Sequence, residues 1–360
     1  MKDILKNKKV LGIIGVVIVL LSIAYIIFVS IDMNNNNNNN NNVTNDDTNK
    51  ESETVNEDSN ETKPVFNIVD VNSDSRPIAV MINNLNAARP YHSGLQDAYI
   101  VYEMIVEGGI TRMMALFKDK DTARIGSVRS SRHYYLDYAL ENDAIYVHYG
   151  WSPQAQEDIP KLGVNNINGL YDDAFWRDNT LNVDYEHTAF TSISKIMNVA
   201  KKKNYSLTSN KDLLLNYSKE EINLSEMDGN ISASSVDIKY SNYVTTSYVY
   251  NSNEKVYYRS VNDKPHKDYV TKKQYSAKNI IIAYMNSSNI ASDSKGRQNL
   301  DNIGSGNGYY ITDGKAVPIT WTKSSRKEQT VYKYKNGEEI VVNDGNTFIQ
   351  NAPLNSVVIK

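Results

Sequence analysis

The chain has 360 residues, no cysteine and a formal net charge of −3 at pH 7. The absence of cysteine excludes disulfides, thiolate metal sites and thiol catalysis. Residues 1–33 carry a net charge of +2 and residues 34–64 carry −5, so the charges of residues 65–360 cancel. A neutral domain of this size has no bulk attraction to nucleic acid, and we expect no nucleic-acid partner.

An uncharged apolar run of 20 residues, Val10 to Val29, follows four lysines. A run of this length crosses a bilayer as a helix, and lysines before it place the N-terminus in the cytoplasm. The run ends in the bulky residues 25–29, where signal peptidase needs small ones. We therefore expect residues 1–33 to be a cytoplasmic tip and a retained signal anchor, in contact with the cytoplasmic membrane through residues 10–29. The protein is then single-pass, with its C-terminal domains extracytoplasmic.

Residues 34–64 begin with an unbroken asparagine tract and continue as a polar, acidic stretch. With almost no apolar side chains, this segment cannot offset the entropy lost on ordering, so we expect a disordered linker. A random coil of about 30 residues has an end-to-end distance of roughly 30 Å. That length suits a tether that reaches toward the cell wall, and it equally suits a spacer without specific use.

Residues 65–204 are predicted to form an N-terminal mixed α/β domain. Short apolar runs predict strands at 78–82, 99–106, 110–117 and 144–149, and Gly108 and Gly109 predict a hairpin between the second and third. Helical patterns cover 130–140 and 192–202, and a further helix begins at Ser152-Pro153 and ends before Gly163. Residues 205–235 are polar and acidic, which is typical of a connector.

Residues 236–360 are predicted to form a mostly β C-terminal domain, so the fold class is α+β. A hairpin is expected from 243–250 and 255–259, and further strands at 280–284, 309–312, 331–334, 340–342 and 357–359. The glycine-rich stretch Gly304–Gly308 lacks the lysine and the helix of a phosphate-binding loop. We interpret it as a hairpin bend.

Glu103 and Glu107 are the candidate catalytic residues. In a strand, Glu103 shares its face with Val101 and Ile105, and loss of solvation there raises the pKa of a carboxyl group. A neutral carboxyl near pH 7 can act as a general acid on a glycosidic bond. The alternative is a structural ion pair with Arg112, Arg129 or Arg132. A pair of acids is not expected, because four strand steps separate the two residues by roughly 13 Å.

The stretch Ile125–Arg132 is a candidate anion site. Free backbone N–H groups at a helix start, with Ser130, Arg129 and Arg132 nearby, are suited to a carboxylate or a phosphodiester. Ordinary helix capping with surface arginines explains the same pattern. Arg112 is expected to join these residues in substrate binding.

The histidines of the first domain have no spacing typical of a metal site, so neither a metal nor a cofactor is predicted. His148 is placed at a strand end, and His187 has Glu186 beside it in sequence. Each of the three is a candidate for orienting a substrate, although packing explains such histidines equally well. Ser–His–Asp catalysis is not indicated, because no GxSxG motif occurs.

Several of these stretches resemble the YerB-like lipoprotein family of Gram-positive bacteria, over essentially all of residues 75–360. The similar segments are Arg76–Asn84, Ala88–Pro90, Tyr102-Glu103, Glu107–Arg112, Gly126 with Val128–Arg132, His148 with Gly150, Gly304–Tyr310 and Thr320–Lys323. The resemblance implies a two-domain envelope protein whose function is unknown. It also brings Asn83 and Asn84 into the candidate substrate-binding set. The chain departs from the family in having an apolar anchor where a lipidated cysteine is expected, and Ser127 where the family usually carries proline.

Two functions of different classes fit the sequence. The first is an enzyme that cleaves peptidoglycan glycan strands, similar to a lytic transglycosylase, with Glu103 or Glu107 as acid/base. The second is a non-catalytic module that binds wall glycan, an anionic wall polymer or a membrane protein through the arginines. A phosphotransferase that attaches polymers to the wall is a weaker third. The sequence favours the first slightly and does not identify a protein partner.

Overall fold

The computed structural model describes residues 67–291 and 293–360. The predicted anchor at 10–29 and the linker at 34–64 lie outside the described residues. Within the part described, no helix is long and apolar enough to cross a membrane. That part is mostly β, with the α-helices α2 (His133–Glu141), α3 (Pro153–Leu162) and α4 (Ile193–Lys202).

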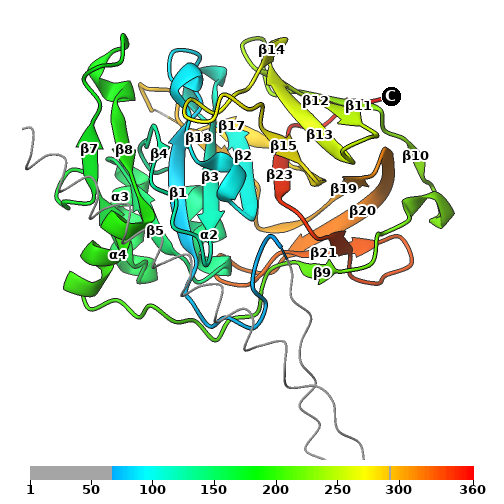
Figure 1. The fold of residues 1–360 in the computed structure, drawn as a ribbon, viewed down its shortest axis with the longest axis horizontal. Coiled ribbons are helices and arrows are strands. Elements are labelled where there is room, and N and C mark those ends of the chain that lie inside the picture. The colour runs from blue at the N-terminus through cyan, green and yellow to red at the C-terminus, as the bar shows by residue number, and fades with distance from the viewer. Residues whose placement is uncertain (1–66, 292) are drawn as a thin grey trace, which may run out of the picture. The chain divides into compact units, whose positions relative to one another are not determined.

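An 11-stranded sheet is built from both halves of the chain (Figure 1). Its order is β10 (Ile231–Ser232), β20 (Lys315–Lys323), β19 (Gly304–Thr312), β16 (Asn279–Tyr284), β23 (Thr347–Ala352), β2 (Ile100–Ile105), β3 (Thr111–Phe117), β1 (Ile78–Asn83), β5 (Ile145–His148) and β6 (Asn166–Asn168), with β21 (Val331–Tyr334) beside β20. Strand β23 lies between β2 and β16 and is parallel to both. The two sequence domains therefore share one sheet.

The predicted N-terminal strands are confirmed. β2 and β3 form an antiparallel hairpin in which Glu103 pairs with Met113. Gly108 and Gly109 have φ of 70° and 68°, the left-handed conformation that favours glycine at this turn. β1, which is wholly buried, pairs antiparallel to β3 and parallel to β5.

A second sheet covers one face of the central strands, seen at the upper right of Figure 1. Its order is β14 (Lys264–Pro265), β13 (Val256–Val261), β12 (Thr245–Asn251), β11 (Ser235–Lys239) and β24 (Val357–Ile359), with β15 (Ser276–Ala277) beside β13. Tyr248 of β12 packs edge-on against Phe348 of β23, with ring centroids 6.0 Å apart. Both belong to a core that also contains Val101 and Met113. On the opposite face the tyrosines of α2 pack against Met81 and Met104.

The remaining strands form small sheets at the edges. They are β4 (Ile125–Gly126), β8 (Ala189–Thr191) and β7 (Phe175–Arg177); β17 (Ser287–Asn289) and β18 (Gln298–Leu300); and β22 (Val341–Asn343) and β9 (Asn216–Ser218). Strands β9 and β10 come from residues 205–235 and pair with β22 and β20, so the predicted connector contributes strands to the C-terminal half of the fold.

Local signals explain the helix boundaries. The Ser152 hydroxyl accepts a hydrogen bond from the Ala155 N–H (3.2 Å), and Gly163 ends α3 in the left-handed conformation. In the same way Ser192 accepts from the Lys195 N–H (3.3 Å) at the start of α4. The bend expected at Gly304–Gly308 is wrong, because this stretch is the first half of the long strand β19. A side chain at Gly308 would meet the Ile282 carbonyl oxygen at 1.8 Å, so glycine permits close strand packing there.

Candidate functional site

Nine of the predicted site residues lie together at one edge of the main sheet. Asn83 is the last residue of β1 and His148 is the last residue of β5, and these two strands are parallel. The segment 127–129 runs across the carboxyl ends of both strands. The Arg129 N–H donates to the Met81 carbonyl (3.0 Å), and the Tyr149 N–H donates to the Arg129 carbonyl (3.0 Å). The carboxyl ends of parallel strands are where open α/β sheets bind ligands. We call this group the strand-end cluster; it consists of Asn83, Glu107, Arg112, Arg129, Ser130, Arg132, His148, Glu186 and His187.

Glu107 is held by two arginines of the strand-end cluster. Its carboxylate accepts from Arg132 Nε (2.7 Å) and forms an ion pair with Arg112 (3.1 Å), and a second contact joins it to Arg132. Burial alone would raise the pKa of Glu107, but the Arg132 hydrogen bond and the charges of Arg112 and Arg132 lower it to about 2. Both arginines are buried, whereas 23% of the Glu107 side chain is exposed. The Ser130 carbonyl accepts a further hydrogen bond from Arg112, so both terminal nitrogens of Arg112 have partners, whereas its buried Nε has none among the described residues.

Arg129 and Glu186 form the outer pair of the strand-end cluster. Their N···O distance is 2.8 Å, and 24% and 53% of the two side chains are exposed. His187, which is buried, contacts Glu186 at 3.5 Å and the Asn83 amide nitrogen at 2.8 Å. This pair is the most accessible charged part of the cluster.

His148 is buried and fully paired. Its Nδ1 lies 2.7 Å from the Gly150 carbonyl oxygen, and its Nε2 lies 3.0 Å from the Asn166 amide nitrogen. The carbonyl can only accept, so Nδ1 carries the proton and Nε2 accepts from Asn166. Burial lowers the pKa of His148 to about 4, against a smaller opposing effect of the Gly150 carbonyl. These contacts are those of a structural histidine.

Glu103 lies on the other face of the sheet, beneath the second sheet. Its side chain has no exposed surface and forms an ion pair with Arg259 of β13 (2.7 Å), which is also fully buried. Its second oxygen accepts from Asn84 (2.9 Å), Thr111 (2.8 Å) and Thr246 (3.2 Å). The expected apolar surroundings are therefore wrong. The alternative of a structural ion pair is confirmed, but the partner is Arg259 and none of the three arginines that were predicted. No local pattern pointed to Arg259, which is 156 residues away in sequence.

A chain of hydrogen bonds continues from Arg259 through two histidines. Arg259 lies 2.6 Å from His266 Nδ1, and His266 Nε2 lies 2.8 Å from His92 Nδ1. His92 Nε2 contacts the Asn83 carbonyl oxygen. Because Arg259 only donates and the carbonyl only accepts, each histidine is neutral with its proton on Nε2.

Burial is the main cause that lowers the pKa of both residues, to about 3 for His92 and well below its usual range for His266. We call His92, His148 and His266 the buried histidines; the name leaves out His187, which is also buried but lies beside the Glu186 carboxylate. The hydrogen bonds from Arg259 through His266 and His92 to Asn83 join the second sheet to the end of β1. No sequence motif had indicated this connection.

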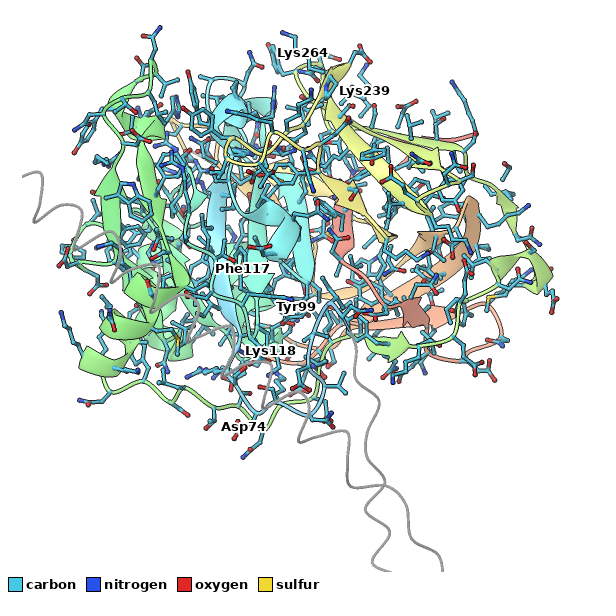
Figure 2. The ribbon with its side chains drawn as sticks, in the orientation of Figure 1. Asp74, Tyr99, Phe117, Lys118, Lys239 and Lys264 are labelled. Carbon is cyan, nitrogen blue, oxygen red and sulfur yellow. The ribbon has the colours of Figure 1, made fainter. Side chains whose placement is uncertain are left out.

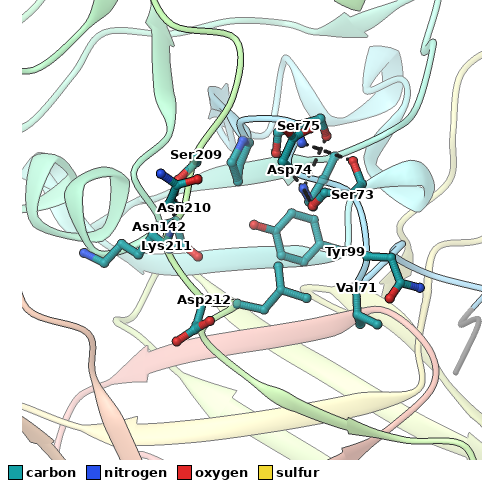
Figure 3. A pocket seen from close by; sticks show the side chains of 14 residues that line it. Val71, Ser73, Asp74, Ser75, Tyr99, Asn142, Ser209, Asn210, Lys211 and Asp212 are labelled. Carbon is teal, nitrogen blue, oxygen red and sulfur yellow. Dashed lines mark hydrogen bonds between the residues drawn. The ribbon is translucent and has the colours of Figure 1, made fainter. Parts of the chain in front are cut away.

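A small polar cavity of about 190 Å³ lies between residues 71–75 and 209–213 (Figure 3). The Tyr99 hydroxyl, buried at its wall, has no hydrogen-bond partner among the described residues. The Lys118 ammonium already donates to the Ser73 carbonyl (2.9 Å) and the Ser75 carbonyl (2.5 Å). A cavity of this size with these groups suits ordered water.

Within the described part of the chain, no group of three or more acidic, histidine or cysteine residues is placed to hold a metal ion. The strand-end cluster therefore offers ion pairs, amides and the partly exposed Arg129. Chemically it is suited to exchange an internal carboxylate for an external anion.

Comparison with known proteins gives the family. Residues 67–206 match the N-terminal domain, and residues 236–349 the C-terminal domain, of DUF3048, a family of proteins of unknown function. The chain belongs to the DUF3048 family. One relative, "Putative lipoprotein YerB" of Bacillus subtilis (strain 168), is 31% identical over 289 residues, which are 78% of this chain and 82% of the relative.

The crystal structure of YerB from Bacillus subtilis matches with a TM-score of 0.69 and 30% identity, covering 79% of this chain and 94% of that one. The resemblance found in the sequence is thus confirmed. The two-domain layout of the DUF3048 family is also that of this chain. Neither match assigns a role to the strand-end cluster or to Glu103.

Proposed function

We propose that this DUF3048 protein is an extracytoplasmic module, anchored in the membrane by residues 10–29, that binds an anionic polymer of the cell wall without cleaving it. The name of its relative, a lipoprotein, supports a place at the outer side of the membrane. The tether at 34–64 suits the same place.

The pairing of Glu107 with Arg112 and Arg132 is the observation that carries the proposal. A general acid must hold a proton at the working pH, and its pKa is usually raised toward neutrality. The two arginines instead lower the pKa of Glu107 to about 2, so the carboxylate is charged at pH 7. This favours an ion-pairing role over catalysis.

The burial of Glu103 supports the same choice. A glycan strand reaches Glu103 only if the second sheet separates from β2, because the carboxylate is enclosed by Arg259, Asn84, Thr111 and Thr246. Glycan cleavage by either glutamate stays a prediction, and the geometry gives it no support.

The outer pair of the strand-end cluster can take part in binding. Exposed ion pairs are worth little in water, on the order of 0–1 kcal/mol, so a phosphate or carboxylate of a ligand can replace Glu186 on Arg129. Arg112 and Arg132 then support binding indirectly, because they hold Glu107 and the Ser130 carbonyl in place.

Sedimentation with purified cell wall tests the proposal. The full chain in detergent is expected to sediment with intact wall, to remain in solution after the anionic polymers have been extracted, and to be released as the salt concentration rises. Retention is expected to survive Glu103→Gln and Glu107→Gln. Equal retention by extracted and intact wall would contradict the anionic ligand.

A further inference from the structure

A cavity of about 340 Å³ lies where residues 86–90 meet residues 261–272. Its volume is within the range of small-ligand sites, about 300–1,000 Å³. Figure 2 labels one of its residues, Lys264, at the top of the view, and places Asp74 and Lys118 of the small polar cavity at the bottom. The larger cavity, of about 340 Å³, is formed by residues of both sequence domains and does not include any residue of the strand-end cluster.

Four cations and one carboxylate line this cavity. The cations are Arg89, Lys264, Lys267 and Lys272, and the carboxylate is Asp268. None of the four cations forms an ion pair within the described residues. The positive charge of the cavity is therefore available to a ligand.

Asp268 offsets only one of these four charges, and its carboxylate forms no ion pair with any of the four cations but is held by neutral donors. It accepts hydrogen bonds from the backbone N–H groups of Gly94 (2.8 Å) and Thr271 (2.8 Å), and from the Tyr275 hydroxyl (2.8 Å). Burial would raise the pKa of Asp268, but these hydrogen bonds lower it. The carboxylate thus stabilises the loop that carries Lys267 and Lys272.

Arg89 is a fixed cation at the wall of the cavity. It is 8% exposed, and its guanidinium donates to the Asn84 carbonyl (3.0 Å) and to the Asn86 side-chain oxygen (2.9 Å). Burial and the charge of Arg259 lower the pKa of Arg89 to about 10, so it stays protonated at neutral pH. The charge of Glu103 opposes this shift only in part, and the hydrogen-bond partners of Arg89 are all neutral. A buried cation with such partners is costly, and an external anion relieves that cost.

The cavity also has apolar walls. Pro90, Pro265 and Val261 line it, together with Tyr269, whose ring lies 4.1 Å from the Lys272 ammonium. Flat apolar surfaces beside fixed cations suit a sugar or polyol ring that bears a negative group.

We propose that this cavity binds one phosphate- or carboxylate-bearing sugar or polyol unit, and that it is the principal ligand site of the protein. This inference rests on the proposed binding of an anionic polymer and deepens it: one unit of the polymer occupies the cavity, and the outer pair of the strand-end cluster is a secondary contact. Arg89 contacts the anion, Lys264 and Lys267 approach it from the rim, and Tyr269 packs against the carbon skeleton of the sugar or polyol.

Titration calorimetry of the full chain in detergent tests the assignment. The probes are an oligomer of glycerol phosphate, an oligomer of glucuronic acid and a neutral dextran oligomer, so that phosphate and carboxylate are distinguished from each other and from an uncharged chain. The double variant Lys264→Ala/Lys267→Ala is expected to bind the preferred anionic oligomer roughly tenfold more weakly. The control Lys201→Ala/Lys202→Ala, which removes the same charge from the exposed end of α4, is expected to bind like the wild type.

A second variant, Arg89→Gln, removes the buried charge and keeps one amide donor for Asn84 or Asn86. It is expected to abolish measurable binding while its circular dichroism stays native. Binding by the Lys264→Ala/Lys267→Ala variant at wild-type strength would overturn the assignment. So would wild-type binding of dextran as strong as that of both charged oligomers, or no binding of either charged oligomer.

Wall sedimentation separates this inference from the proposed function. If retention persists in Lys264→Ala/Lys267→Ala but is lost in Arg129→Ala/Arg132→Ala, the cavity is not the site, although the binding function stands. If the wild type binds the charged oligomers through the cavity but is not retained by any wall, the wall function is wrong and the anion site stands.

Discussion

Replacing Glu107 by glutamine is the sharpest test of its ion pairs with Arg112 and Arg132. The substitution removes the charge at nearly constant volume. The pKa of Glu107 falls from an ordinary 4.5 to about 2 in the folded protein. This difference corresponds to about 3 kcal/mol of folding free energy, and solvent screening of the part-exposed carboxylate reduces it to about 2 kcal/mol. We expect Glu107→Gln to lower the free energy of unfolding at pH 7 by about that amount.

The pH dependence of this loss follows from the direction of the shift. A lowered pKa in the folded state means that the stabilisation is complete above about pH 4.5 and is lost as the pH falls toward 2. Wild type and Glu107→Gln should therefore differ most near neutrality and converge over that window.

Urea unfolding of residues 67–360, the part that contains both DUF3048 domain matches, measures the difference at several pH values. The control is Glu157→Gln, since Glu157 pairs with Lys161 at the surface and is expected to contribute less than about 0.5 kcal/mol. Equal stability of Glu107→Gln and wild type at pH 7, or a difference that grows on acidification, would refute the reasoning.

Three further predictions concern stability and use the same unfolding assay. Arg259→Met leaves Glu103 buried without its partner and should lower the free energy of unfolding by about 3–5 kcal/mol. The double variant Arg259→Met/Glu103→Leu should recover most of this loss, and no recovery would mean that the two residues do not form a pair. The buried histidines are neutral in the folded protein and charged in the unfolded chain below pH 6.5. The free energy of unfolding of the wild type should therefore fall on acidification below that pH, by up to roughly 4 kcal/mol per pH unit near pH 5. A free energy of unfolding that does not change with pH would contradict their burial. Gly308→Ala should cost roughly 2 kcal/mol or more because the new methyl group meets the Ile282 carbonyl, whereas Asn307→Ala in the same strand should be nearly neutral.

Most of the N-terminal fold was predictable because its signals are local. The apolar runs at β1, β2 and β3 are short and bounded by polar residues, and glycines mark the hairpin. Ser152 and Gly163 bound α3 as their chemistry requires. Each of these features depends on residues within a few positions of one another.

Strand β23 was not predictable on such grounds. Its residues Gln350 and Asn351 are polar, yet both are buried at the centre of the main sheet. The Tyr240 hydroxyl donates to the Gln350 side-chain oxygen (3.1 Å), a partner 110 residues away. Partners of this kind come only from the tertiary fold.

The same difference between local signals and partners distant in sequence applies to the candidate site. Nine of its predicted residues lie together, because the ends of neighbouring strands meet at one edge of the sheet, and their role in binding stays a prediction. Their pairing was not found: the sequence cannot tell that Glu107 takes both Arg112 and Arg132, or that Glu103 faces Arg259. The cavity around Arg89 was missed because its cations come from two segments that are far apart in sequence.

Incubation of purified cell wall with the full chain, followed by mass analysis of the soluble fraction, tests the central claim most directly. If the protein binds the wall without cleaving it, the protein is recovered with the wall and no soluble glycan fragment is released above the buffer control. Release of muropeptides by the wild type, lost in Glu107→Gln or Glu103→Gln, would contradict the account and restore the glutamates as catalytic residues.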